Sequence, residues 1–222
     1  MHMLASAPHH RNEDAIVNDR SEESRRLFWR MGLAKIRRFI HHPDPLVEMS
    51  NWVAIIIGTH LPFWPLYIWW SSDSQALPSA LLTAALTPVF ILIPFLSHWN
   101  GLLGRIAMLL MGTTNTVLTI WILGANTGTD LFLVPCTALA IILFRHNERW
   151  LMLIFTTLPV VVWYVLKHHP INHLHLYTEA QAHEILILTA ISIGFLMGLF
   201  GWLQANTYRR IENAHNALTQ NT

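Results

Sequence analysis

The chain has 222 residues, of which 53% are hydrophobic and 12% are charged, and its formal net charge is +1. Because soluble domains carry about 25% charged residues, this composition excludes an ordinary soluble domain and predicts an all-α membrane protein whose surface contacts the lipid bilayer. We expect no nucleic-acid partner. The single cysteine, Cys136, lies in an apolar run and cannot form an intrachain disulfide.

The first fifty residues are polar and charged, a composition that predicts no cleavable signal peptide. Residues 1–18 are predicted to be disordered. Residues 19–49 are predicted to carry a basic amphipathic helix, in which apolar residues alternate with Arg and Lys. Two interpretations of this helix stay open: it lies on the anionic inner leaflet, or it is solvated and supplies only the positive charge of the cytoplasmic side.

Six segments are apolar enough to cross a bilayer, which takes about 20 residues, with a range of about 17–25. They are residues 51–70, 76–97, 103–123, 129–144, 150–166 and 185–204. The fourth and fifth are short, so a tilted span and a partly re-entrant element are both compatible with their length. The predicted fold is therefore a six-transmembrane-helix bundle over residues 50–204, followed by a C-terminal helical stalk over residues 205–222.

The distribution of Arg and Lys predicts the orientation of this bundle. If the N-terminus is cytoplasmic, 13 of the 14 basic residues lie on the cytoplasmic side and only Lys167 lies outside. Because cytoplasmic loops carry an excess of Lys and Arg, both termini are predicted to be cytoplasmic.

The predicted spans hold few ionisable residues, and the chain has no HExxH, no GxSxG and no glycine-rich phosphate loop. We therefore expect no catalytic residue in these 222 residues. His60 and His98 could ligate haem only if they lay at the same depth, and their predicted depths differ, so we do not expect haem. A transporter or channel would need a polar pathway, for which the run Thr113, Thr114, Asn115 and Thr116 is the nearest candidate.

Aromatic residues and prolines are concentrated in the outer halves of the predicted spans. Prolines distort helices and free backbone carbonyls, and aromatic side chains line pockets for apolar ligands. This concentration suggests a membrane pocket for a small hydrophobic or lipid-like ligand. The alternative is an aromatic belt that faces lipid. The candidate pocket residues are His60, Trp64, Tyr67, Asn115, Trp121 and Trp163.

The longest predicted outer loop is rich in histidine and precedes the sixth span. Its candidate ligands are His168, His169, His173, His175, His183 and Glu184. Neutral imidazoles suit Zn, Cu and Ni, and clustered histidines that gain charge near neutral pH repel one another. A metal site, a pH sensor and an ordinary polar loop all stay open for residues 168–183.

The sixth span runs into the predicted stalk without a proline. Gly194 and Gly198 form a small-xxx-small pattern that allows two helices to approach closely, so we predict a homodimer contact there. Beyond the span, Ile211, Ala214 and Leu218 have the spacing of a short coiled-coil seam and are predicted to transmit a signal.

Three stretches resemble the six-helix membrane domains found ahead of bacterial class III adenylate cyclases, and related domains ahead of some sensor histidine kinases. They are PFLSHWNGLLGR, TIWILGANTGTDLFLVPCTALAIILFRHNERWLMLIF and GWLQANTYRRIENAHNAL. The matching features are Asn100 and Gly101 after the second span, the outer turn Gly124…Gly128 with Asp130, Phe132 and Pro135, and Phe144 at the inner end of the fourth span.

The resemblance implies a dimeric, receptor-like domain in the inner membrane of a bacterium, which modulates a C-terminal output enzyme of the adenylate cyclase type that these 222 residues do not include. A ligand that binds from the outer side or from the membrane would shift the sixth helix, provided that it prefers one of two packings. The alternatives are the sensory module of a histidine kinase, a small transporter or channel, and a passive dimerising anchor.

Overall fold

The computed structural model describes residues 32, 34–71, 77–169 and 177–219. The chain divides into two compact units, residues 1–41 and residues 42–222. In the first unit, residues 34–40 form a helix. In the second unit, the described residues form helices and turns and include no strand, so the all-α prediction is confirmed.

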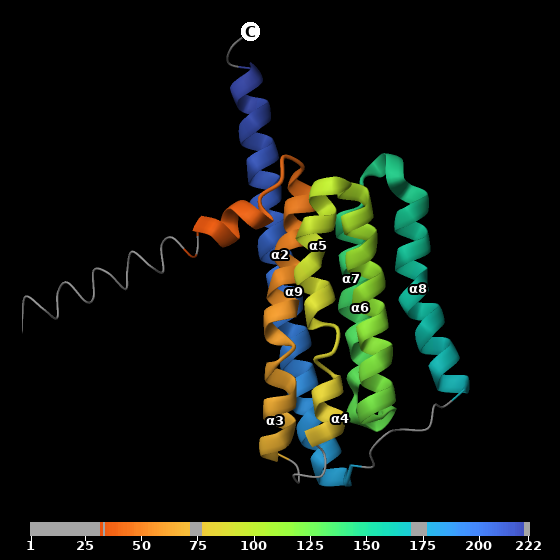
Figure 1. Ribbon diagram of the computed structural model, residues 1–222. Coiled ribbons are helices and arrows are strands. Elements are labelled where there is room, and N and C mark those ends of the chain that lie inside the picture. Colours follow the sequence, from red (N-terminus) through yellow and green to blue (C-terminus); the bar gives the residue numbers. More distant parts are fainter. Residues whose placement is uncertain (1–31, 33, 72–76, 170–176, 220–222) are drawn as a thin grey trace, which may run out of the picture. The chain divides into compact units, whose positions relative to one another are not determined.

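The second unit is a bundle of helices that run alternately up and down (Figure 1). Short 3₁₀ helices connect α6 to α7 and α7 to α8. The α-helices are α2 (Pro45–His60), α3 (Phe63–Ser71), α4 (Leu77–Leu82), α5 (Thr87–Trp99), α6 (Gly101–Leu123), α7 (Leu133–Leu143), α8 (Arg149–His168) and α9 (Glu179–Thr219). The 3₁₀ helices are η2 (Ala125–Thr127), η3 (Thr129–Phe132) and η4 (His146–Glu148). We call one end of the bundle the basic end, which is marked by Asp44, Asn100 and Arg145. The opposite end, which we call the far end, is marked by Gly124 and Lys167.

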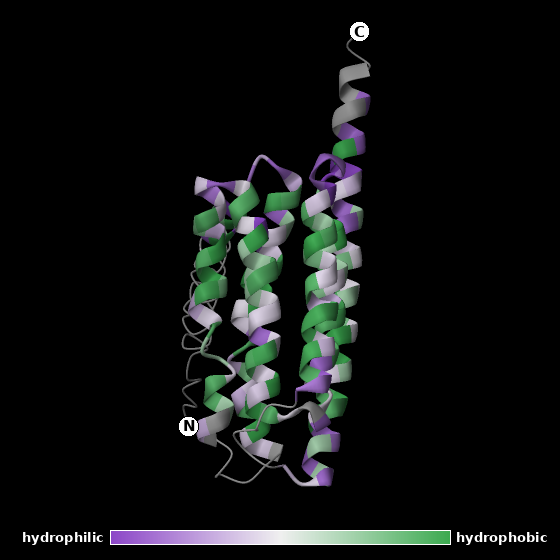
Figure 2. Ribbon diagram, turned by 90° about the vertical axis from the view of Figure 1, so that its right-hand side faces the viewer, coloured by the Kyte–Doolittle hydropathy of each residue, from purple (hydrophilic) through white to green (hydrophobic). Residues whose placement is uncertain are grey.

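Among the residues that the structure describes, five helical stretches are long and apolar enough to cross a membrane. They are Pro45–Trp70, Ala80–Trp99, Gly101–Leu123, His146–His168 and Glu179–Asn213. The segment expected to be the fourth span is a shorter apolar helix, Thr129–Leu143. Figure 2 shows hydrophobic residues along the middle of the helices and hydrophilic residues gathered toward their ends. This pattern is typical of a bundle whose sides contact lipid.

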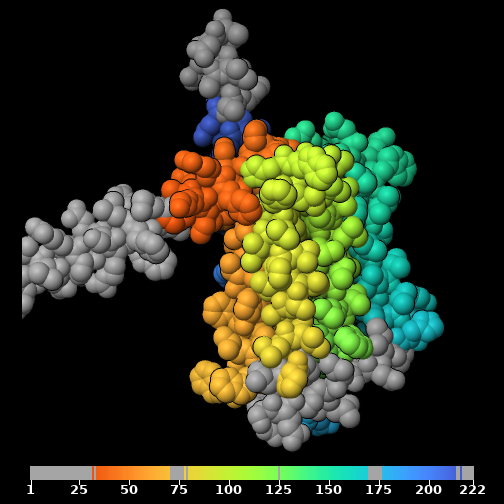
Figure 3. Space-filling model, in the orientation of Figure 1, coloured from red at the N-terminus to blue at the C-terminus, as the bar shows by residue number. Residues whose placement is uncertain are grey.

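The position of each helix in the bundle decides which helices can build a site. α8 packs chiefly against α7 and lies at the edge of the bundle, as Figures 1 and 3 show. Large apolar side chains such as Leu153, Val161 and Tyr164 are exposed on it. α2, α5, α6, α7 and α9 form the centre of the bundle instead, so a site inside the bundle is built chiefly from these five helices and the segments that connect them.

Local sequence explains where the central helices begin at the basic end. The Asp44 carboxylate accepts a hydrogen bond from the Leu46 amide (3.0 Å) at the start of α2, where Pro45 fits the first helical position. The Asn100 side chain accepts from the amides of Leu102 and Leu103 (3.0 and 3.1 Å) at the start of α6. This cap joins α5 and α6 through a one-residue turn.

A buried charge also lies at the basic end. Arg105 is only 3% exposed, and its guanidinium donates to both carboxylate oxygens of Glu148 at 2.7 and 2.8 Å and to the carbonyl of Leu143 at 2.6 Å. The Glu148 carboxylate also accepts from the Arg145 amide (3.0 Å). Because a bidentate pair with further hydrogen bonds compensates the desolvation of a buried arginine, this network fixes α6 to the turn between α7 and α8.

The side chains inside the bundle form two apolar clusters. One lies toward the basic end and includes Met49, Val53, Met108 and Leu143. The other lies toward the far end and includes Ile68, Ala80, Ile122 and Ile185. The boundary between the two clusters is where both α2 and the α4–α5 stretch are interrupted.

We expect Gly104→Ala to destabilise the bundle, because a Cβ at this position would lie 2.9 Å from the Ser97 Cα on α5. Backbone atoms cannot give way as a flexible side chain can, so the cost is about 1–3 kcal/mol. The measurement is the thermal unfolding midpoint in detergent micelles. Gly201→Ala is the matched control, because no neighbouring atom of the described residues lies within 4 Å of its added Cβ. Equal midpoints for the two variants would contradict close packing of α5 on α6.

Candidate functional site: a cavity inside the helix bundle

Two proline-dependent breaks interrupt helices at the same level of the bundle. α2 ends at His60, because Pro62 has no backbone N–H to donate to the Gly58 carbonyl. Leu61 and Pro62 form a turn, and α3 continues from Phe63. The break lies about 24 Å along the helix from the start of α2, since each helical residue adds about 1.5 Å.

The second break separates α4 from α5. Residues 83–86 form successive turns, and Pro88 removes the donor that would continue a regular helix, so the Ala84 carbonyl accepts from the Thr87 amide instead (3.0 Å). The Thr83 hydroxyl donates to the Ala80 carbonyl at 2.6 Å. At each break one side chain turns inward: Leu61 and Thr83 are buried and line the space between the helices, whereas Pro62 and Pro88 themselves are exposed.

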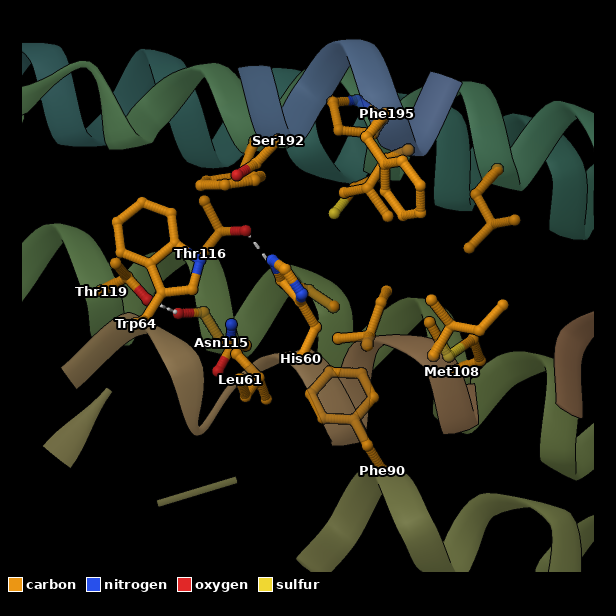
Figure 4. Close-up of a pocket in the computed structure, with 18 of the residues that line it drawn as sticks. His60, Leu61, Trp64, Phe90, Met108, Asn115, Thr116, Thr119, Ser192 and Phe195 are labelled. Atoms are coloured by element: carbon orange, nitrogen blue, oxygen red, sulfur yellow. Dashed lines mark hydrogen bonds between the residues drawn. The ribbon is translucent and has the colours of Figure 1, made fainter. Parts of the chain in front are cut away.

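Between the breaks lies a cavity of about 90 Å³ (Figure 4). Its wall combines side chains from α2, α3, the 83–86 turn, α5, α6, η3, α7 and α9, whereas α8 contributes none of the described residues. The labelled part of the wall comprises His60, Leu61, Trp64, Phe90, Met108, Asn115, Thr116, Thr119, Ser192 and Phe195. The cavity is therefore a gap in the core where the two apolar clusters meet.

The cavity has a mostly apolar wall with a few polar groups. The Trp64 and Phe132 rings meet edge to face, 5.7 Å apart, on the far-end side. Phe90, Met108 and Phe200 belong to the buried apolar cluster on the basic side. None of the lining residues that the structure describes is Asp, Glu, Lys or Arg, so the cavity suits an uncharged ligand.

The polar groups of the wall differ in whether they are already satisfied. The hydroxyls of Thr116 and Thr119 donate to the carbonyls of Gly112 and Asn115, at 3.0 and 2.7 Å. The Asn115 side-chain oxygen, in contrast, is buried and has no hydrogen-bond partner among the described residues. A buried acceptor without a donor costs about 1–3 kcal/mol, so a ligand that supplies a donor gains that energy.

The six predicted pocket residues do not lie together. His60, Trp64 and Asn115 line the cavity, but Tyr67, Trp121 and Trp163 do not. The Trp163 indole on α8 donates to the Asp130 carboxylate (3.3 Å), which also pairs with Lys167 (3.3 Å). The cavity is also lined by residues that the sequence pattern did not single out, among them Ser192, Phe195, Phe132, Cys136 and Met108. Only the two helix-breaking prolines could have pointed to the level at which these side chains meet.

The histidine-rich segment is only partly described. His173 and His175 lie outside the described residues. The His168 ring nitrogen Nδ1 contacts the Tyr164 carbonyl at 2.9 Å, and His183 and Glu184 are exposed on the first turns of α9. Among the residues that the structure does describe, no group of three or more His, Cys, Asp or Glu side chains is arranged to hold a metal. The metal and pH hypotheses stay predictions.

The haem hypothesis required His60 and His98 at one depth. His60 ends α2 on the far side of the bundle centre, whereas His98 lies in the last turn of α5 at the basic end. The His98 Nδ1 atom is 2.6 Å from the Pro94 carbonyl, and its ring meets His42 edge to face at 6.2 Å. The structure thus places the two imidazoles at different levels.

The residues predicted for the dimer contact and for transmission lie on two faces of α9. Gly194 and Gly198 are exposed, and no neighbouring atom from the described residues lies within 4 Å of an added Cβ at either position. Ile211 instead lines a hollow between α9, α2 and α7, together with Gln204 and Thr207. The two faces are about a third of a turn apart around the helix. The side chains of Ala214 and Leu218 lie outside the described part of the chain.

Residues 46–221, from α2 to beyond the end of α9, match the model of MASE7, a family of membrane-associated sensor domains. Among curated proteins, no sequence matches this chain.

Proposed function

The chain belongs to the MASE7 family of membrane-associated sensor domains, and from this membership we propose that a ligand in the cavity is the signal and that α9 carries it to an output enzyme. The observation that supports this proposal is the course of α9. The helix supplies Ser192, Phe195, Leu196 and Phe200 to the cavity wall and then continues without a break to Thr219.

The described contacts of α9 suit a helix that can shift. Near the basic end, the Arg210 guanidinium donates to the Glu48 carboxylate on α2 at 3.1 Å, and the Arg210 side chain is 56% exposed. Only the Glu48 end of this pair is buried, so the pair holds α9 to α2 less firmly than the buried Arg105–Glu148 pair holds α6. A ligand that prefers one packing of α9 by a few kcal/mol is enough to shift the population between two states.

The proposal also includes a membrane topology with six crossings. Thr129–Leu143 has four 3₁₀ residues and eleven α-helical residues, which together span about 24 Å. That length approaches the roughly 30 Å of a bilayer core, so we count it as a sixth crossing. With six crossings, the basic end faces the cytoplasm. In a bacterium this places the domain in the inner membrane, with α9 leading toward a C-terminal enzyme of the adenylate cyclase type or, alternatively, a histidine kinase.

A transporter or channel receives less support from the geometry. The basic side of the cavity is closed by Phe90, Met108, Leu139 and Phe200, which are buried and apolar. A polar pathway would have to pass through this layer. Asn115 and the threonines near it therefore line a compartment that is closed toward the basic end, which suits a sensor.

The experiment joins residues 1–222 to a reporter cyclase catalytic domain in membranes. We expect Ser192→Phe, which fills the cavity from α9, to shift basal cyclase activity severalfold, because it mimics occupancy of one state. Thr114→Leu on the exposed side of α6 is the control and should leave activity unchanged. Inserting two residues after Asn213 turns the output by about 200° and should abolish the shift, whereas seven residues make almost two full turns and should keep it. If the two-residue and the seven-residue insertions both keep the shift in activity, transmission through α9 is contradicted.

The same reporter separates the cavity from the histidine segment. Titration with Zn, Cu, Ni and pH is compared in the parent and in a variant with His168, His169, His173 and His175 changed to Ala. A response that disappears only in this variant would assign the input to the histidine segment and count against the cavity.

The proposal includes a parallel homodimer through the exposed glycines of α9. We expect Gly194→Leu with Gly198→Leu to weaken dimerisation in liposomes about tenfold or more, because large side chains keep two helices from close approach. Single-molecule photobleaching counts the subunits. Thr157→Leu on the exposed surface of α8 is the control for added bulk. An unchanged dimer fraction in the glycine variant would place the contact elsewhere.

A further inference from the structure

The exposure of the lining residues locates the mouth of the cavity. Of the side chains that line it in the described part of the chain, only His60 on α2 and Phe195 on α9 are exposed, and Phe195 is 59% exposed. Deeper residues of the wall, such as Trp64, Thr116 and Ser192, are buried. The cavity therefore opens sideways, between α2 and α9. Figure 4 shows the His60 ring and the Phe195 ring in the space between these two helices.

The depth of the mouth decides what reaches it. His60 lies about 24 Å along α2 from the basic end, and Phe195 lies about 24 Å along α9 from its start at the far end. Both stretches belong to helices long and apolar enough to cross a membrane. A mouth at that level of a spanning bundle faces the hydrocarbon core, so the path into the cavity leads from lipid and not from water.

The residues that line the cavity determine which class of ligand it can bind. An ion that entered through hydrocarbon would be desolvated, and the described lining residues offer it no opposite charge. The Asn115 side-chain oxygen is the buried acceptor that still needs a donor. At about 90 Å³ the cavity is smaller than the roughly 300–1,000 Å³ of sites that enclose a drug-sized ligand. It therefore accommodates a small head group, and a longer chain must extend through the mouth.

We propose that the ligand is an uncharged, bilayer-soluble amphiphile that enters between His60 and Phe195, donates a hydrogen bond from a hydroxyl or N–H group to Asn115 Oδ1, and leaves its apolar chain in the mouth between α2 and α9. This inference deepens the proposed function, because it names the class of ligand for the same cavity. It also explains how a membrane-dissolved molecule would contact α9 directly, through its chain beside Phe195 and its head group beside Ser192.

The test uses 1-dodecanol analogues that carry a photoreactive diazirine, with the full chain in lipid nanodiscs. A diazirine next to the hydroxyl should label α6 near Asn115, and a diazirine at the end of the chain should label α2 and α9 near His60 and Phe195. Mass spectrometry of peptides locates the label. Labelling confined to α8, or to the connections at either end of the bundle, would overturn the lateral entry.

Competition defines the head-group chemistry. Unlabelled 1-dodecanol should displace the probe, whereas dodecyl methyl ether, which lacks a donor, and dodecyltrimethylammonium, which is charged, should compete at least about tenfold less well. Equal competition by the ether would overturn the hydrogen bond to Asn115. Equal competition by the ammonium compound would overturn the requirement for an uncharged ligand.

Two variants test the site itself. Asn115→Leu keeps the volume of the side chain and removes the acceptor, and it should lower the affinity for 1-dodecanol about tenfold. It should not change the affinity for the methyl ether. Thr114→Leu, one residue away and exposed, should change neither. Labelling does not depend on an output enzyme, so failure here with an intact cavity-dependent response in the reporter rejects the ligand class and leaves the proposed sensor function standing.

Discussion

The bundle depends on one constraint: backbone polar groups released by proline cannot face lipid. Pro62 and Pro88 interrupt two helices at one level, and turn hydrogen bonds partly meet the constraint there, from the Trp64 amide to the Leu61 carbonyl (3.2 Å) and from the Thr87 amide to the Ala84 carbonyl (3.0 Å). Side chains from α5, α6, α7 and α9 then surround the breaks without filling the space between them. The cavity lies at the level of both breaks, and Leu61 and Thr83 from the two breaks belong to its wall.

The helices around the cavity differ in how firmly they are held. Helices with interruptions can change their packing at low cost near the break, whereas α9 is continuous from Glu179 to Thr219. At the basic end, α6 is fixed to the turn before α8 by the buried Arg105–Glu148 pair, while the Glu48–Arg210 pair between α2 and α9 is largely exposed on its arginine side. The bundle thus combines a fixed part, α6 to α8, with a less constrained helix that leads out of it.

The sequence could predict the helices better than the cavity. The third predicted span, 103–123, agrees with α6 at Gly101–Leu123, because its start is set by the Asn100 cap and its length by an apolar run. The first predicted span, 51–70, is broken near Leu61, and the prolines predicted distortion there without its direction. Ser192 and Phe195 could not be assigned to a wall, because lipid and protein core are both apolar and the pattern on α9 does not reveal which face turns inward.

The central claim is that occupancy of the cavity moves α9 relative to the fixed part of the bundle. The most direct measurement is the distance between spin labels at Arg149→Cys, at the start of α8, and Asn213→Cys on α9, by pulsed electron paramagnetic resonance in a Cys136→Ser background. Cys136 lines the cavity, so this background is first checked for labelling by the probe as in the parent. With 1-dodecanol in the nanodisc, the distance distribution should shift by about 1–2 Å or more, and Asn115→Leu should remove the shift at the same concentration. An unchanged distribution while the probe cross-links inside the cavity would contradict the account.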